Sequence, residues 1–166
     1  MMIWDNRAFE SGEPGSALYA AGDNDSGRVQ LVSGRASNGD RYVRNIAVDL
    51  TTNGGTHIIS AAQTFLAGTA AGRSALHFDG GAEIRNNDLT TTITSANNLR
   101  VMLLGALNAS AGATLHLTGK IGDVIFVNGV SATDRQRVEG YLAHKWGLTA
   151  NLPSDHPFRN QPPYKE

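Results

Sequence analysis

Acidic and amide side chains with the spacing of a cation-binding loop occur near the start of the chain. Residues 23–27 read Asp-Asn-Asp-Ser-Gly, so oxygen-bearing side chains alternate and a glycine allows a sharp turn, as at the beginning of a calcium loop. The later carboxylate that completes such a loop is missing. An Asx-rich hairpin turn is the interpretation that we favour. Calcium, held by Asp23 and Asp25, stays open as the alternative, and we expect no other cofactor.

Patterns that would support catalysis are weak. A glycoside hydrolase on a β-sandwich places two carboxylates on one strand, about 5 to 5.5 Å apart, whereas Glu83 and Glu139 have no such partner nearby in the sequence. No Gly-x-Ser-x-Gly elbow is present, and the glycine-rich residues 68–72 lack the Lys-Ser/Thr pair of a phosphate-binding loop. We therefore expect no enzymatic activity and keep hydrolysis as the weaker alternative. The histidines lack metal-ligand spacing, so we expect structural roles for His57, His77, His116, His144 and His156.

Composition narrows the class of protein. The 166 residues fit one domain with its own core, and the absence of cysteine excludes disulfide scaffolds and thiolate metal sites. Fourteen basic residues against fifteen acidic ones give a net charge of −1 without any run of like charges, so we expect neither a nucleic-acid partner nor a polybasic membrane patch. No apolar stretch is long enough to cross a bilayer, and residues 1–7 lack the pattern of a signal peptide.

The elements that must position these residues are mostly strands. Short β-branched runs alternate with Gly, Asn and Asp, which predicts about eight to ten strands in two packed antiparallel sheets. Residues 17–21 and 29–32 predict a hairpin around the loop 22–27, and the turn 79–81 predicts a second, tighter one. Further strands are expected at 42–50, 56–65, 99–107 and 115–121, and the apolar run 124–127 predicts a strand covered on both faces.

One helix is expected near the C-terminus. Ser131 has the position of an N-cap, Asp134 that of its capping-box partner, and Gly147 that of the residue that ends the helix. We therefore predict a helix over 132–146, packed through Val138, Leu142 and Trp146. The proline-containing tail 149–166 predicts irregular structure, anchored by Leu152, Phe158 and Tyr164.

The C-terminal third resembles a known family. The run 119–130 reads GKIGDVIFVNGV, residues 131–148 read SATDRQRVEGYLAHKWGL, and residues 152–158 read LPSDHPF. Together they resemble the end of laminin G-like, concanavalin A-like (lectin-glucanase) jelly-roll domains of bacterial and phage proteins. The resemblance implies a single lectin-like β-sandwich over 1–166 that binds glycans or proteins without chemistry of its own. It also implies that strands are missing at the N-terminus, and we expect residues 1–9 to pair with another polypeptide at the open sheet edge.

We therefore expect a lectin-like module that recognises a cell-surface polysaccharide, as part of a phage, a phage-like particle or a surface assembly. A purely structural or decoration protein of such an assembly is the alternative. The expected partners of the chain are a glycan and either further copies of the chain or another structural protein. We expect it on the outside of a cell or particle, without insertion into a membrane. Polar loops at 22–27, 34–40 and 108–113 form the expected rim, because short Asn, Asp and Ser side chains suit sugar hydroxyls. The candidate ligand-binding residues are Asp23, Asn24, Asp25, Asn38, Asp40 and Asn108.

Overall fold

The computed structural model describes the chain in two compact units. The described residues are 2–5, 16–22, 25–33, 43–49, 55–63, 68–69, 74–84, 92–93, 103–105, 107–109, 112–114, 119–129 and 131–164. One unit comprises Met1–Gly54, Ala61–Leu76 and Ile84–Lys120, and the other comprises Gly55–Ser60, His77–Glu83 and Ile121–Glu166. The units interleave along the sequence, so the expectation of a single domain over 1–166 stays a prediction.

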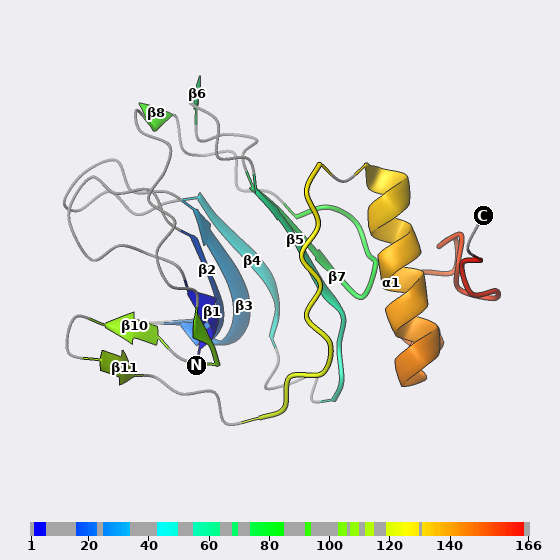
Figure 1. The fold of residues 1–166 in the computed structure, drawn as a ribbon, viewed down its shortest axis with the longest axis horizontal. Coiled ribbons are helices and arrows are strands. Elements are labelled where there is room, and N and C mark those ends of the chain that lie inside the picture. The colour runs from blue at the N-terminus through cyan, green and yellow to red at the C-terminus, as the bar shows by residue number, and fades with distance from the viewer. Residues whose placement is uncertain are drawn as a thin grey trace. The chain divides into compact units, whose positions relative to one another are not determined.

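The first unit contains a five-stranded sheet with the order β4-β3-β2-β1-β9 (Figure 1). Its strands are β1 (Met2–Asp5), β2 (Ser16–Gly22), β3 (Asp25–Ser33), β4 (Val43–Asp49) and β9 (Leu103–Leu104). The predicted hairpin is confirmed, because β2 and β3 pair antiparallel. The paired strands extend into the loop expected at 22–27, since Gly22 pairs with Asp25. β1 pairs with β2 on one side and, at Trp4 and Asp5, with β9 on the other. Residues 6–9 lie outside the described residues, so the expected pairing of residues 1–9 with another polypeptide stays a prediction.

The remaining strands form three two-stranded sheets. They join β5 (Ile59–Gln63) to β7 (Ser74–Phe78), β6 (Gly68–Thr69) to β8 (Thr92–Ile93), and β10 (Leu107–Ala109) to β11 (Gly112–Thr114). The predicted tight hairpin follows β7, where Asp79 and Gly80 have φ angles of 48° and 70° and the Gly81 N–H donates to the Phe78 carbonyl. Positive φ at both central residues is the geometry of a type I′ turn, which Asp-Gly favours.

The prediction of a β-sandwich is wrong. The described strands form one five-stranded sheet and three two-stranded sheets, and the part whose side chains are described holds only the β5–β7 pair beside one helix. Short apolar runs identified many of the strands, but such runs carry no information about which strands pair. The expected covered strand at 124–127 is also wrong, since these residues have no strand pairing and their side chains are exposed.

The second unit is built around α1 (Ala132–Trp146), where the predicted helix is confirmed. Ser131 accepts from the backbone N–H of Asp134, the Asp134 carboxylate accepts from the backbone of Ser131, and both partners of the capping box are therefore present. Gly147 ends the helix in the left-handed conformation with φ 70°. The following backbone N–H, that of Leu148, donates to the Ala143 carbonyl at 2.7 Å.

The core of this unit joins α1 to the C-terminal tail. Ile58, Ala143 and Leu152 are buried together, with Leu142 and Leu148 packed against them. The tail begins with a single 3-10 turn, η1 (Thr149–Asn151), and continues without a helix or strand to residue 164. The expected anchor Leu152 is confirmed, but Tyr164 is 77% exposed and anchors nothing.

Candidate binding surface on the C-terminal helix

Two aromatic side chains of α1 face solvent near its C-terminal end. Tyr141 and Trp146 are each 49% exposed. The Lys145 ammonium lies 5.8 Å from the centre of the Tyr141 ring and 5.9 Å from that of Trp146. These distances lie within the range of a cation–π contact. The helix thus exposes two aromatic rings with one ammonium group near both. These residues are not those of the polar loops at 22–27, 34–40 and 108–113, where the sequence predicts the binding surface.

The segment before the helix fixes the Trp146 ring. The indole Nε1–H donates to Asp123 Oδ2 at 2.8 Å, and the Lys145 ammonium donates to Asp123 Oδ1 at 2.9 Å. Gly122 lies against the ring, and a Cβ at that position would be 3.0 Å from the indole Cζ2. The indole is therefore held by a polar contact at its edge and by glycine backbone beside it. We call Asp123, Tyr141, Lys145 and Trp146 the aromatic surface.

The contacts within the aromatic surface perturb two charges. The pKa of the Asp123 carboxyl is lowered below its ordinary value. The hydrogen bond from Lys145 is the main cause, and the hydrogen bond from Trp146 is the second. The hydrogen bond to Asp123 is the main cause that raises the pKa of Lys145. Both groups are therefore charged at neutral pH, and the surface presents a fixed pair of opposite charges beside two aromatic rings.

We expect the indole N–H resonance of Trp146 to titrate at a lower pH than an ordinary exposed aspartate. A depressed folded-state pKa means that the stabilising contact is complete above the unfolded pKa and is lost as pH falls through the folded pKa. NMR titration measures this, with Trp4 and Trp146 distinguished by a Trp146→Phe variant. Lys145→Met should move the midpoint upward, because it removes the largest cause. A midpoint at or above the ordinary aspartate value would contradict the contact.

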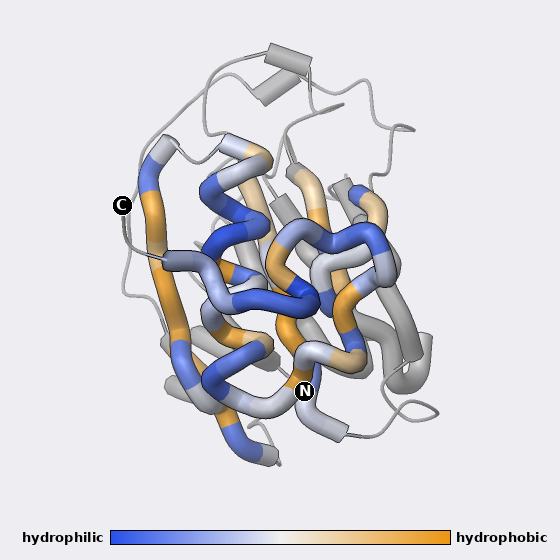
Figure 2. Tube along the Cα trace, turned by 90° about the vertical axis from the view of Figure 1, so that its right-hand side faces the viewer, coloured by the Kyte–Doolittle hydropathy of each residue, from blue (hydrophilic) through white to orange (hydrophobic). Residues whose placement is uncertain are grey.

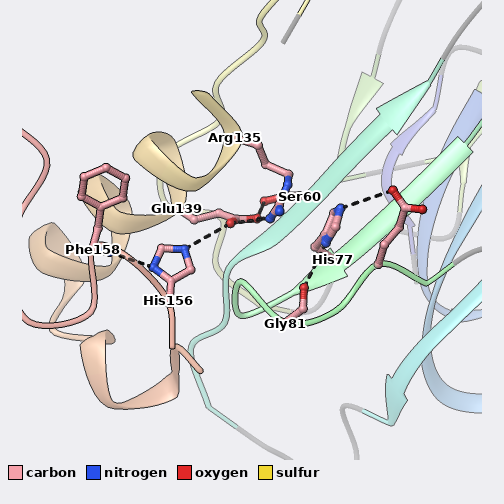
Figure 3. Close-up of polar contacts among 8 residues, drawn as sticks. Ser60, His77, Gly81, Arg135, Glu139, His156 and Phe158 are labelled. Carbon is pink, nitrogen blue, oxygen red and sulfur yellow. Dashed lines mark hydrogen bonds and ion pairs between the residues drawn. The ribbon is translucent and has the colours of Figure 1, made fainter. Parts of the chain in front are cut away.

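A second polar cluster lies inside the unit, around Glu139 (Figure 3). The Glu139 side chain is fully buried, and Arg135 Nη1 donates to both of its carboxylate oxygens at 2.6 Å. The Ser60 hydroxyl at the start of β5 donates to Oε1, also at 2.6 Å. His156 Nε2 from the tail lies 3.5 Å from Oε2. One carboxylate therefore links the helix, the strand and the tail.

The order of groups in this cluster is wrong for nucleophilic catalysis. In a serine triad the histidine stands between the serine and the acid, so that it can accept the hydroxyl proton. Here the carboxylate stands between Ser60 and His156. His156 Nδ1 accepts from the Phe158 backbone N–H at 3.3 Å, which places the proton of the neutral ring on Nε2, facing Glu139. The cluster therefore joins the tail to the helix, which is a structural role of the kind expected for His156.

Other histidines of this unit are also held by polar partners. His57 Nδ1 lies 2.7 Å from Asp79 Oδ2, and Asp79 Oδ1 accepts from the backbone N–H of Ile58 at 2.8 Å. His77 Nδ1 donates to the Gly81 carbonyl at 3.0 Å. These contacts agree with the structural roles expected for both histidines. His116 lies outside the described residues.

The described part of the structure does not show the six candidate ligand-binding residues together in one site. Asp23, Asn24, Asn38 and Asp40 lie outside the described residues. Asp25 belongs to β3, opposite Gly22, and Asn108 belongs to β10, opposite Ala113; only their backbones are described. A glycan or calcium role for these six residues stays a prediction. Across the described part of the chain, no three side chains of His, Asp or Glu gather as metal ligands.

The aromatic surface was missed because Trp146 was predicted to lie on the buried face of the helix, and that placement is wrong, since Trp146 is 49% exposed. The fully buried positions are instead Glu139, Gly140 and Ala143. The available signal was the pair of small residues, Gly140 and Ala143, which lets another segment approach the helix closely. Apolar spacing alone gave too much weight to the larger side chains.

Comparison with known proteins does not assign the chain to a family. No known protein family, curated protein or solved structure matches the chain. The resemblance to laminin G-like domains therefore stays an expectation from the sequence. Within the described residues, no helix combines the length and the hydrophobicity that crossing a membrane requires.

Proposed function

We propose that this chain is a non-catalytic carbohydrate-binding module that recognises a cell-surface polysaccharide. The observation that carries the proposal is the half-exposed Trp146 ring, held by Asp123 and flanked by Lys145 and Tyr141. A sugar ring has an apolar C–H face and a polar rim. An exposed indole beside fixed donors and acceptors offers complementary surfaces to both.

The fixed geometry of the ring supports this function. The hydrogen bond from the indole to Asp123 and the contact with Gly122 restrict the ring before any ligand arrives. A side chain that is already ordered loses little conformational entropy on binding, so more of the contact energy appears as affinity. The charged groups of Asp123 and Lys145 can form hydrogen bonds with hydroxyl or carboxylate groups of a polysaccharide. The apolar face of a sugar needs only the indole ring of Trp146.

The first experiment is a glycan array probed with the full chain, followed by titration calorimetry with each glycan that binds. We expect Trp146→Ala to weaken binding by about tenfold or more, which corresponds to about 1.4 kcal/mol. Tyr164→Ala is the matched control, since Tyr164 is 77% exposed but lies outside the aromatic surface. It should bind like the unmodified chain. Far-ultraviolet circular dichroism and thermal melting verify that each variant is folded.

Two further variants separate the aromatic surface from the loops expected from the sequence. Asp23→Ala and Asn108→Ala should leave the affinity unchanged if the helix carries the site. Loss of binding in these variants, with Trp146→Ala unaffected, would place the site on the loops and overturn the assignment to α1. If no bacterial capsule or cell-wall glycan binds, the carbohydrate-binding proposal itself is wrong.

A structural role in a surface or phage-like assembly is the second candidate. The observation that favours it is the exposure of large apolar side chains at Ile121 and over 124–127. Exposed apolar patches mark surfaces that bind other macromolecules. Recovery of the chain in purified particles, together with no affinity for any glycan, would favour this candidate over carbohydrate binding.

A further inference from the structure

The charges of the aromatic surface come as one closely bound pair. Asp123 is the only charged residue of the largely hydrophobic segment 121–127, which runs beside α1 (Figure 2). Its carboxylate accepts from the Lys145 ammonium at 2.9 Å and from the Trp146 indole at 2.8 Å. The negative charge of Asp123 and the positive charge of Lys145 therefore cancel, and the aromatic surface carries no net charge although it contains two ions.

The other charged side chains of α1 do not disturb this balance. Arg135 pairs with Glu139 at 2.6 Å, and Arg137 lies 3.9 Å from Asp134. Each of these pairs also joins one positive to one negative group. A charged ligand that approaches the aromatic surface along the helix therefore meets no excess of charge that would attract it.

The ion pair still offers hydrogen-bonding groups to a ligand. The side chains of Lys145 and Asp123 are 41% and 29% exposed. An ammonium has three donors and a carboxylate has several lone pairs, so their contact with each other and with Trp146 uses only part of this capacity. A sugar hydroxyl both donates and accepts, so one hydroxyl can donate to Asp123 while its neighbour accepts from Lys145. A carboxylate on the sugar would instead be repelled by Asp123.

We propose that the aromatic surface selects neutral sugars, with the C–H face of an uncharged pyranose on the Trp146 ring and two neighbouring hydroxyls at Asp123 and Lys145. The inference rests on the carbohydrate-binding function proposed above and adds the chemical class of the glycan. Sugars that carry a carboxylate, such as hexuronic acids, bind less tightly. The lowered pKa of the Asp123 carboxyl and the raised pKa of Lys145 agree with this, because they keep both charges of the pair in place at neutral pH.

Pairs of glycans that differ only in charge test the selectivity. For each glycan that the full chain binds on the array, a partner is prepared in which a hydroxymethyl group at C6 is oxidised to a carboxylate, or a carboxylate is reduced to the alcohol. Titration calorimetry should show that the neutral member binds about threefold or more tightly, as expected for an exposed charge contact. Raising the salt concentration from about 50 to about 500 mM should change the affinity for the neutral member by less than about twofold, since screening acts on charged ligands.

Variants of the ion pair should change this preference. Asp123→Asn removes the negative charge but keeps an oxygen that accepts from the indole, and it leaves Lys145 uncompensated. The ratio of the two affinities should then move toward the acidic glycan by about threefold or more. Asp155→Asn is the matched control, because Asp155 is an exposed aspartate of the tail outside the aromatic surface. Lys145→Met should move the ratio toward the neutral glycan, whereas Lys120→Met, at another exposed lysine, should leave it unchanged.

The outcomes separate this inference from the proposed function. If the unmodified chain prefers the acidic glycans and Trp146→Ala still abolishes binding, the aromatic surface binds carbohydrate and the selectivity for neutral sugars is wrong. A preference that Asp123→Asn and Asp155→Asn change equally also overturns the inference, since the ion pair then does not set it. If no glycan binds the unmodified chain, the carbohydrate-binding function and the inference fail together.

Discussion

Replacement of Glu139 by alanine is expected to lower the free energy of unfolding by about 3 to 5 kcal/mol, the range measured when one partner of a buried ion pair is removed. The carboxylate is fully buried and accepts from Arg135 and from Ser60. Its loss leaves the guanidinium and the hydroxyl without their acceptor. Neither group regains full contact with water unless the surrounding structure opens. Urea unfolding followed by circular dichroism measures the change.

Two variants show whether the buried charge is responsible. Glu83→Ala is the control, because the Glu83 side chain is 41% exposed and lies 4.0 Å from His77 Nε2; its loss should cost less than about 1 kcal/mol. Arg135→Met combined with Glu139→Leu should cost less than Glu139→Ala alone, because it removes both charges and fills the space with apolar atoms. If Glu139→Ala costs no more than Glu83→Ala, the ion pair does not support the fold.

Local signals in the sequence predicted the parts of the fold that local interactions determine. The capping box of Ser131 and Asp134 marks the start of α1, and Gly147 marks its end, because each satisfies backbone groups within a few residues. The turn at Asp79 and Gly80 is also determined locally, since its geometry depends on two adjacent residues that tolerate positive φ. None of these features needs information from a distant segment.

Features that depend on distant segments were not predicted. The apolar run 124–127 suggested a covered strand, but the run contains no information about which strand, if any, pairs with it. The aromatic surface depends on which side of α1 the tail covers. That choice comes from the contacts of Glu139 with Ser60 and from the tail beside Gly140, and both involve residues far away in the sequence or beyond the helix.

Gly140→Ala is expected to destabilise the protein, although alanine favours a helix. A Cβ at position 140 would collide with the Cβ of Phe158 and lie 3.0 Å from its Cγ. Alanine contributes about 1 kcal/mol of helix propensity over glycine, whereas overpacking of a close contact costs about 1 to 3 kcal/mol or more. Because the collision involves atoms next to the backbone, we expect a net loss of about 2 kcal/mol, measured by thermal or urea unfolding.

The tail should report this change directly. Phe158 is bound on both sides, because its backbone N–H donates to His156 Nδ1 and its carbonyl accepts from His144 Nε2 at 3.0 Å. Displacement of Phe158 by the new methyl group breaks these contacts, so trypsin should cleave after Arg159 faster in Gly140→Ala than in the unmodified chain. In a Phe158→Gly background the obstacle is gone, and the same substitution should then stabilise the helix by up to about 1 kcal/mol. This reversal of sign is specific to the contact between α1 and the tail. If Gly140→Ala already stabilises the unmodified protein, the tail does not lie against this face of the helix.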